Sequence, residues 1–303
     1  VIFVCLLSIV LPWNNILTIQ NICSSTIDWS VLVGSKDSWI IFAAVCLITL
    51  LCNLIYPKFI LLEAKKKRTL FVVLGVSANL LILGFFKYYN FFTENIELLL
   101  KGLSFDPARF HLNIILPVGI SFYAFKGISY VIDVYRGSVA PEKQHINFAL
   151  FIGFFPALLA GPLDRAKDLL SQFATTRRPN AEDIYAGLHL FLYGLFKKVV
   201  IADGVVRTVS SVFESSGQVS WIDVVVASVF FTIQIYCDFS GYTDMARGTA
   251  RFFGINLTLN FNLPYFSKNP REFWSRWHIS LSSWLRDYLY IPLGGNRHGS
   301  AKT

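Results

Sequence analysis

The chain has 303 residues, of which 54% are hydrophobic and only 15% are charged, and its mean hydropathy is +0.52. A soluble domain carries about a quarter charged residues, so this composition excludes a disordered chain, a collagen-like fibre and an ordinary cytosolic enzyme. The net charge of +8 does not indicate nucleic-acid binding, because apolar stretches separate the basic residues and no continuous basic patch forms. The composition predicts a membrane protein.

The sequence is expected to be part of a longer protein, cut at both ends. It begins at Val1, its one methionine is Met245, and a polar stretch, Gly294–Thr303, follows a dense cluster of functional residue types. The five cysteines form no CxxC pair and lie at no zinc-like spacing from a histidine. This pattern favours buried thiols over metal ligands or a disulfide framework, and no metal site is predicted.

Several segments approach the roughly 20 apolar residues that a helix needs to cross a bilayer. The clearest are Trp39–Leu62 and Leu70–Phe92. Weaker spans that contain polar residues are Asn113–Val134, Ile184–Val206 and Trp221–Asp238, while Val1–Ile19 is the expected remainder of a first span. Asn147–Leu163 and Thr243–Phe253 are apolar but short or broken. The predicted fold class is an all-α polytopic membrane protein.

Basic residues in the loops give the expected orientation, because cytoplasmic loops are enriched in Lys and Arg. The run Lys65–Arg68 is cytoplasmic by this rule, and so is the basic loop 164–183. Both loops can be cytoplasmic only if 147–163 enters the membrane and returns, which fits its Pro156. We therefore expect one membrane domain over 1–303. Its parts are a partial span and outer loop (1–38), a transmembrane core (39–238) and a cytoplasmic-side re-entrant and interfacial segment (239–303).

Charged side chains inside membrane segments are costly and often functional. Lys126, Lys197, Lys198 and Asp203 are such residues. Lysines can also extend along apolar surface to the interface, so the sequence leaves both interpretations open. Lys126 is better placed for function, because polar residues surround it and Pro117 predicts a kinked helix that lines a cavity.

A second polar cluster spans Gln234–Ala246, with the carboxylates Asp238 and Asp244 and the hydroxyl of Ser240. We expect this cluster to end one span and begin a short helix, with Asp238 or Ser240 as the N-cap. The N-terminus of that helix would favour an anion or oxyanion. Capping without a catalytic role is the alternative.

The densest cluster, Asn269–Tyr290, predicts one amphipathic helix that starts near Pro270. His278, Ser282 and Arg286 would lie on one face at i, i+4 and i+8. A neutral imidazole can accept a proton from a hydroxyl near pH 7. A helix that lies flat on the membrane with its tryptophans at the headgroups is the alternative.

Four blocks in order together resemble the membrane-bound O-acyltransferase family, in its bacterial branch of alginate O-acetyltransferase type. They are Leu116–Tyr123 with Ser129–Gly137, Phe154–Pro156 with Ala160–Pro162, Gln234–Ala246, and Arg271–Arg297. The resemblance implies a many-helix enzyme in the bacterial cytoplasmic (inner) membrane, with a central tunnel. It implies transfer of an acyl group, acetyl first, from acyl-CoA or an acyl-carrier thioester to hydroxyls of an exported polysaccharide or envelope glycopolymer. It implies no bound cofactor, and an extracytoplasmic acyltransferase as a possible partner.

The resemblance also gives expected site residues. His278 matches the first of two family histidines and is expected to be accessory, because the second, catalytic histidine would lie beyond Thr303. Asp238, Ser240, Asp244, Ser282, Arg286 and Lys126 are the expected substrate or tunnel residues. Relatives often carry Gln where this chain has Lys126. A transporter or flippase, or a non-catalytic scaffold subunit, remains the alternative function.

Overall fold

The computed structural model describes residues 64–103 and 116–298, except 159, 216 and 218, together with the isolated positions 43 and 47. The N-terminal segment 1–38 and, apart from positions 43 and 47, the predicted span Trp39–Leu62 lie outside these residues. The chain divides into two compact units, Val1–Pro141 and Glu142–Thr303, which are described separately. All regular elements of the described part are helical and none is a strand, which confirms the predicted all-α class.

Among the described residues of the first unit are two antiparallel helices, α6 (Ala64–Gly102) and α7 (Ile120–Arg136). With 39 residues, α6 is about 58 Å long. Gly75 and Gly127 allow close packing, because a Cβ on Gly75 would lie 3.2 Å from Val131 Cγ1 and one on Gly127 would lie 2.7 Å from Asn79 Oδ1. At the end of α7, Gly137 adopts φ 74° and its N–H donates to the last carbonyls of the helix.

The predicted kinked span Asn113–Val134 is wrong at its start. The helix begins only at Ile120, after Pro117 and the left-handed Gly119 (φ 76°), so the proline precedes the helix and does not kink it. Lys126 on this helix is completely buried.

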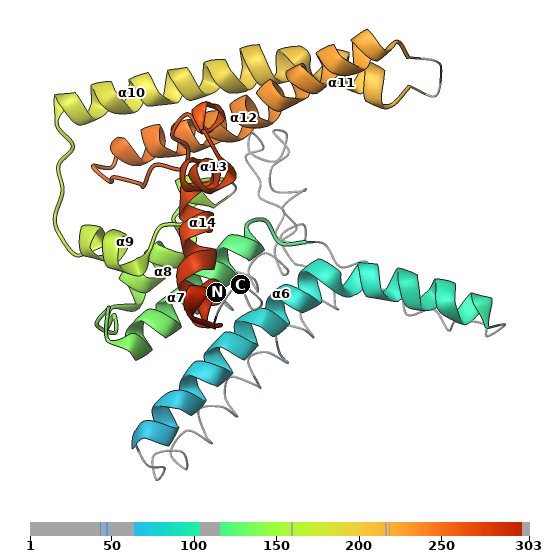
Figure 1. The fold of residues 1–303 in the computed structure, drawn as a ribbon. Helices are drawn as coiled ribbons and strands as arrows, with labels where there is room; N and C mark the ends of the chain where they lie inside the picture. Colours follow the sequence, from blue (N-terminus) through green and yellow to red (C-terminus); the bar gives the residue numbers. More distant parts are fainter. Residues whose placement is uncertain are drawn as a thin grey trace, which may run out of the picture. The chain divides into compact units, whose positions relative to one another are not determined.

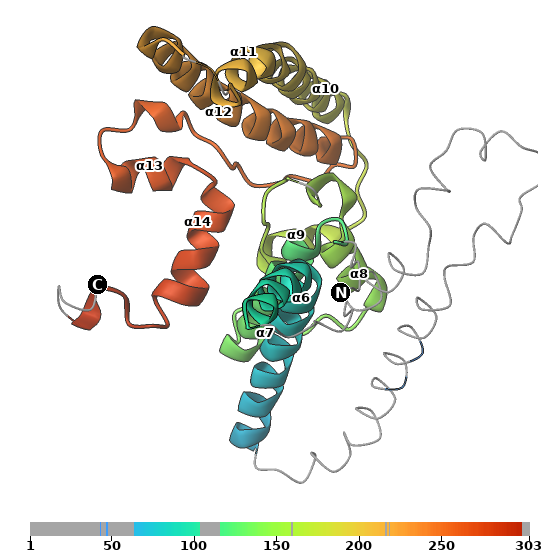
Figure 2. The same cartoon turned by 90° about the vertical axis from the view of Figure 1, so that its right-hand side faces the viewer.

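The second unit is organised around a long antiparallel helical hairpin (Figure 1). Its first arm runs continuously through α10 (Ala181–Leu195), the π-helical segment η2 (Phe196–Ala202) and α11 (Asp203–Phe213). Its second arm is α12 (Trp221–Arg251), which lies beside α10 in both views (Figure 1, Figure 2). Asn180 and Asp183 form a capping box at the start of α10, and Ser220 caps α12.

Two pairs of glycines bring the arms together, Gly187 with Gly248 and Gly194 with Gly241. The members of each pair meet backbone to backbone: a Cβ on Gly194 would lie 2.5 Å from the Gly241 carbonyl oxygen, and one on Gly248 would lie 2.6 Å from that of Gly187. The two glycines on each helix are seven residues apart, so both lie on the same face. Small residues at such contacts let membrane helices approach closely.

The remaining elements of the second unit are short. They are α8 (His145–Gly153), η1 (Phe155–Ala157), α9 (Ala166–Phe173), η3 (Pro264–Phe266), α13 (Pro270–Arg276), α14 (Ile279–Leu285), η4 (Arg286–Tyr290) and η5 (Gly295–His298). The helix α8 ends before Pro156, as predicted for the broken segment 147–163. Its entry into the membrane stays a prediction.

The second arm corrects the predicted end of a span at Asp238. The helix α12 continues without a break to Arg251, so Asp238 and Ser240 lie inside it and cap nothing. Most of the apolar segment Thr243–Phe253 is the last part of α12, which ends at Arg251. Asp238 resembles a capping residue locally, but it pairs with Lys198 of the neighbouring arm, as Asp244 does with Lys197.

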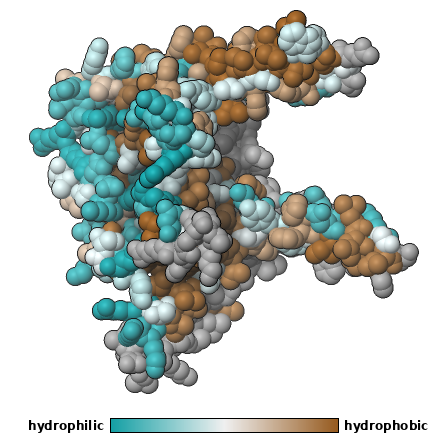
Figure 3. All heavy atoms as spheres, viewed as in Figure 1, coloured by the Kyte–Doolittle hydropathy of each residue, from teal (hydrophilic) through white to brown (hydrophobic). Residues whose placement is uncertain are grey.

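Three helices among the described residues are long and apolar enough to cross a membrane: Lys65–Gly102, Ala181–Phe213 and Trp221–Arg251. They contain the predicted spans Leu70–Phe92, Ile184–Val206 and Trp221–Asp238. Hydrophobic side chains cover the end of the hairpin formed by α11 and α12, and also α6 toward its C-terminal end (Figure 3). These exposed apolar surfaces confirm the prediction of a membrane protein.

The glycine contacts give a first prediction. Gly194→Ala should destabilise the hairpin by about 1–3 kcal/mol, because its Cβ would collide with the backbone of α12. Gly204→Ala on α11 is the matched control, since a Cβ there meets nothing within 4 Å and a helical Ala is favoured by up to about 1 kcal/mol. Thermal unfolding of the purified full-length protein in detergent measures both. Equal effects of the two substitutions would contradict the packing described here.

Candidate functional site

The centre of the candidate site is a break in the helix at His278. The helix α13 ends at Arg276, Trp277 is extended, and His278 adopts the left-handed conformation (φ 42°, ψ 53°) before α14 begins. The loop after α12 runs alongside and supplies backbone partners: Ile279 N–H donates to the Asn260 carbonyl (2.9 Å) and Asn262 N–H to the Arg276 carbonyl (2.9 Å). These two hydrogen bonds replace those that a continuous helix would make.

The predicted single helix over Asn269–Tyr290 is therefore wrong, because α13 ends before His278. His278, Ser282 and Arg286 still follow at four-residue steps, since the N–H of Ser282 donates to the His278 carbonyl and that of Arg286 to the Ser282 carbonyl. Ser282 closes the break, because its hydroxyl donates to the Trp277 carbonyl (3.0 Å) and its N–H to that of His278 (2.9 Å). Arg286 begins the π-helical turn η4, is exposed, and pairs with Asp287 at 2.8 Å. Of the three residues, His278 is the one beside the loop.

The polar contacts of His278 converge on Asn260, which is completely buried. The Asn260 Oδ1 atom lies 3.1 Å from His278 Nδ1, 3.1 Å from the Ser280 nitrogen and 2.8 Å from Ser280 Oγ. Ser280 Oγ in turn accepts from the Leu163 N–H at 2.9 Å. One amide thus links the helix break, the loop after α12 and the Gly-Pro-Leu turn before α9.

Two aromatic rings pack against the half-buried imidazole. Phe239 of α12 contacts it edge to face at a centroid distance of 4.7 Å, and Phe261 lies nearly parallel to it at 6.4 Å. Burial among these groups lowers the pKa of His278 to about 4, because the charged form loses its hydration. At neutral pH the ring is uncharged and is a hydrogen-bond acceptor and only a weak base.

The predicted residues of α12 lie next to this site and pair with η2. Lys197 Nζ lies 2.5 Å from Asp244 Oδ2 and 3.4 Å from Ser240 Oγ, and all three side chains are buried. Lys198 Nζ lies 2.6 Å from Asp238 Oδ1 and 2.8 Å from Asp203 Oδ1, in a more exposed position. The π-helical turn η2 presents the two consecutive lysines to α12 and α11. Such π-helical turns are frequent at functional sites.

Arg165 and Asp287 form a further part of the site that the sequence analysis missed. Their 2.9 Å ion pair lies beside Tyr288, with the Arg165 guanidinium 4.6 Å from the ring centroid. Burial alone would raise the pKa of Asp287, but its pairs with Arg286 and Arg165 hold it below the ordinary value. The ion pair borders a cavity of about 340 Å³ next to the helix break. Its lining residues are Leu163, Arg165, Asp168, Thr258, Leu259, Ile279, Ser280, Ser283 and Asp287.

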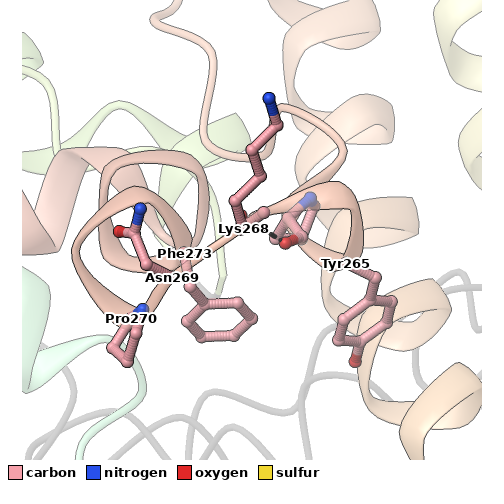
Figure 4. Close-up of a pocket in the computed structure, with 7 residues that line it drawn as sticks. Tyr265, Lys268, Asn269, Pro270 and Phe273 are labelled. Carbon is pink, nitrogen blue, oxygen red and sulfur yellow. Dashed lines mark hydrogen bonds between the residues drawn. The ribbon is translucent and has the colours of Figure 1, made fainter.

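A second, more open groove of about 400 Å³ lies at the start of α13, between Pro264 and Phe273. The rings of Tyr265 and Phe273 point to one side of the loop, and the amine of Lys268 points to the other (Figure 4). Asn269 caps α13 through the Glu272 N–H at 2.9 Å. This groove is mainly apolar, and none of the predicted site residues lines it.

Five of the predicted site residues lie near one another in the second unit. They are Asp238, Ser240, Asp244, His278 and Ser282. Phe239, between Asp238 and Ser240, contacts His278, so the α12 cluster adjoins the helix break. Asp244 joins through Lys197, and Ser282 through the turn that it closes. Lys126 belongs to the first unit and is not part of this group. Among the described residues, no group of three or more His, Cys, Asp or Glu side chains has an arrangement that could hold a metal ion.

The two lysine pairs differ in burial, which gives a second prediction. Asp244→Asn removes the carboxylate of a nearly enclosed pair and should cost about 3–5 kcal/mol of stability. Asp238→Asn is the control, because Lys198 keeps Asp203 and the site is half exposed, so the cost should be below about 1 kcal/mol. Denaturation of both variants in detergent measures the difference. Similar losses would show that the burial of the Lys197 pair has no energetic consequence.

Comparisons with known proteins agree with this architecture. Residues 141–303 match the membrane-bound O-acyltransferase family. The chain is 45% identical over 233 residues to a probable alginate O-acetylase of Pseudomonas aeruginosa, covering 77% of this chain and 44% of that protein. It is 39% identical over 256 residues to a peptidoglycan O-acetyltransferase of Helicobacter pylori (76% and 48%). It is 31% identical over 185 residues to a teichoic acid D-alanyltransferase of Bacillus subtilis (59% and 46%).

The chain spans about half the length of the curated relatives that it matches. The family match covers the whole of the second unit, including the helical hairpin, the helix break and the cavity beside it. On this evidence, the chain belongs to the membrane-bound O-acyltransferase family.

Proposed function

We propose that the protein is a membrane O-acyltransferase that moves an acyl group, acetyl in the simplest case, from a thioester to hydroxyls of a cell-envelope polymer. The observation that carries the proposal is the neutral, partly buried His278 at a helix break beside a cavity. The names of the relatives, which include an alginate O-acetylase and a peptidoglycan O-acetyltransferase, support the substrate class.

The reaction joins the acceptor oxygen to the thioester carbonyl carbon and breaks the carbon–sulfur bond. The hydroxyl proton leaves the acceptor, and the departing thiolate takes up a proton, so the reaction consumes and releases none overall. Such a transfer needs an acceptor for the hydroxyl proton and donors for the developing oxyanion. It requires the acceptor oxygen to lie close to the carbonyl in the correct orientation.

His278 suits the orienting role. A pKa of about 4 makes it a weak base but a permanently neutral hydrogen-bond acceptor at physiological pH. In this proposal His278 accepts a hydrogen bond from the acceptor hydroxyl and aligns its oxygen. The stronger base would be the histidine that the family resemblance predicts beyond Thr303. The ion pairs of Asp238 and Asp244 would hold α12, and with it Phe239, against the imidazole.

The membrane helices supply the setting. The proposed donor is acyl-CoA or an acyl-carrier thioester that arrives from the cytoplasm, and the proposed location is the bacterial inner membrane. The acceptor would be an exported polysaccharide, reached directly through a central tunnel or by way of an extracytoplasmic acyltransferase partner. The cytoplasmic placement of residues 239–303 follows from the basic loops and belongs to the same proposal.

A substitution at His278 tests the function. In the full-length protein, His278→Asn should reduce polymer-bound O-acetyl groups by about 100-fold, because the acceptor hydroxyl loses its alignment. Asn tolerates the left-handed backbone of this position, so the turn is kept. His189→Asn is the control, since His189 is exposed on α10 and stacks on Tyr193. Near-normal acetylation by His278→Asn at normal protein level would reject an enzymatic role for this residue and favour a scaffold.

The pH dependence of acyl transfer is a separate prediction. His278 acts in its neutral form, which is present above its pKa and lost as the pH falls through about 4. At saturating donor, protonation of His278 should therefore cause no loss of activity around pH 6.5, the ordinary pKa of a histidine. A pH–rate profile of the full-length enzyme tests this. An acid limb near pH 6.5 that His278→Asn abolishes would contradict the neutral, desolvated ring.

A further inference from the structure

The orientation of the Asn260 side chain is determined by its neighbours. The Ser280 backbone N–H can only donate, and it lies 3.1 Å from the Asn260 Oδ1 atom. The oxygen of the amide must therefore face Ser280, and the NH₂ group must point away. The Asn260 Nδ2 atom has no hydrogen-bond partner among the described residues, although it is buried.

This orientation determines which nitrogen of His278 carries the hydrogen. An amide oxygen can only accept, and His278 Nδ1 lies 3.1 Å from it, so Nδ1 must be the protonated nitrogen. A neutral imidazole has one N–H, and therefore Nε2 carries the lone pair. Within the described part of the chain, Nε2 has no hydrogen-bond partner.

The backbone around the imidazole is strained in the same place. Apart from glycines, the only described residues with positive φ are Leu263 (44°) and His278 (42°). They lie next to the two backbone hydrogen bonds between the loop and the helix break, which pair residue 279 with 260 and residue 262 with 276. Unfavourable conformations of this kind persist only where the surroundings impose them, and they cluster at active sites. The loop that imposes the turn also carries the amide that contacts the ring.

We infer that Asn260 is a positioning residue that holds His278 in the Nδ1–H tautomer, so that Nε2 presents its lone pair to the acceptor hydroxyl. The inference rests on the proposed function, because the hydroxyl is the proposed ligand of Nε2. Asn260 acts through His278 and is not itself a catalytic residue. In serine proteases a carboxylate holds the catalytic imidazole in its tautomer in the same way, and its loss is costly.

The carboxylates on the elements around His278 are held in ion pairs with other side chains. Phe239 and Phe261, which touch the ring, do not titrate. Asp238 pairs with Lys198, Asp244 with Lys197 and Arg247, Glu272 with Arg276, and Asp287 with Arg286 and Arg165. Arg271 of α13 is exposed and has no ion-pair partner among the described residues. The loop residues 255–263 include no titratable side chain.

Two substitutions of similar size separate positioning from packing. Asn260→Asp keeps the oxygen that faces His278 and replaces only the NH₂ group, which has no partner among the described residues. Its negative charge favours the imidazolium, so the acid limb of the pH–rate profile should move upward by about one to three pH units, with activity retained above it. Asn260→Leu keeps the shape without an acceptor and should lower acyl transfer by about 10-fold or more at every pH.

The tautomer can be measured without any activity assay. Nitrogen NMR of the full-length protein labelled with ¹⁵N-histidine distinguishes Nδ1–H from Nε2–H, and the His278 signal is the one absent from His278→Asn. The wild type should show the Nδ1–H form, and Asn260→Leu should show a mixture. An Nε2–H wild type, or an unchanged tautomer in Asn260→Leu, overturns the inference.

The two experiments also separate this inference from the proposed function. An Nδ1–H tautomer that depends on Asn260, in a protein whose His278→Asn variant acetylates normally, would reject the acyltransferase role of His278 and leave the positioning contact in place. If His278→Asn is inactive and Asn260→Asp neither retains activity nor shifts the acid limb of the pH–rate profile, the positioning role is wrong and the function stands.

Discussion

The close approach of α10 and α12 at their glycines is the contact on which the site depends. A Cβ on Gly241 would lie 3.2 Å from Lys197 Cβ, so the glycine contact and the Lys197–Asp244 pair occupy neighbouring turns of the same interface. With the arms at this distance, the lysine reaches its carboxylate at 2.5 Å in a nearly enclosed position. Separation of the arms would leave Lys197 without its carboxylate and Asp244 with Arg247 of its own helix alone, at 3.4 Å, and the loss of a buried ion pair is strongly unfavourable. The helix that carries Phe239 to the imidazole is thereby fixed.

The helix break at His278 follows from a second constraint, the need of buried backbone groups for partners. The loop at residues 260–262 offers a carbonyl and an N–H to the backbone on either side of the break. The Asn260 amide completes the arrangement by contacting both the ring and the start of α14. A side chain held by a strained turn and a buried amide would lose little entropy on binding the proposed acceptor. For the proposed reaction, the imidazole is preorganised and neutral.

The sequence predicted the helical class, the three described spans and most of the polar clusters, because charged residues in apolar segments are conspicuous. The predictions from sequence were wrong where a side chain or backbone group contacts a residue that is distant in the sequence. Asp238 and Ser240 resemble capping residues locally, and only η2, about 40 residues earlier, shows why the helix continues. No Pro or Gly marks the break between Trp277 and Ile279, because the loop at Asn260 causes it. The sequence contains one weak indication of Asn260. In the loop 255–263, polar residues, among them Asn256, Asn260 and Asn262, alternate with apolar ones.

In the proposed reaction, donor and acceptor meet at the turn of His278. A structure of the full-length protein with a non-hydrolysable thioester analogue tests this most directly. We expect the acyl carbonyl to lie beside the His278 turn, with Nε2 facing the space that an acceptor hydroxyl would occupy. An analogue bound elsewhere, with the imidazole enclosed by protein side chains alone, would contradict it.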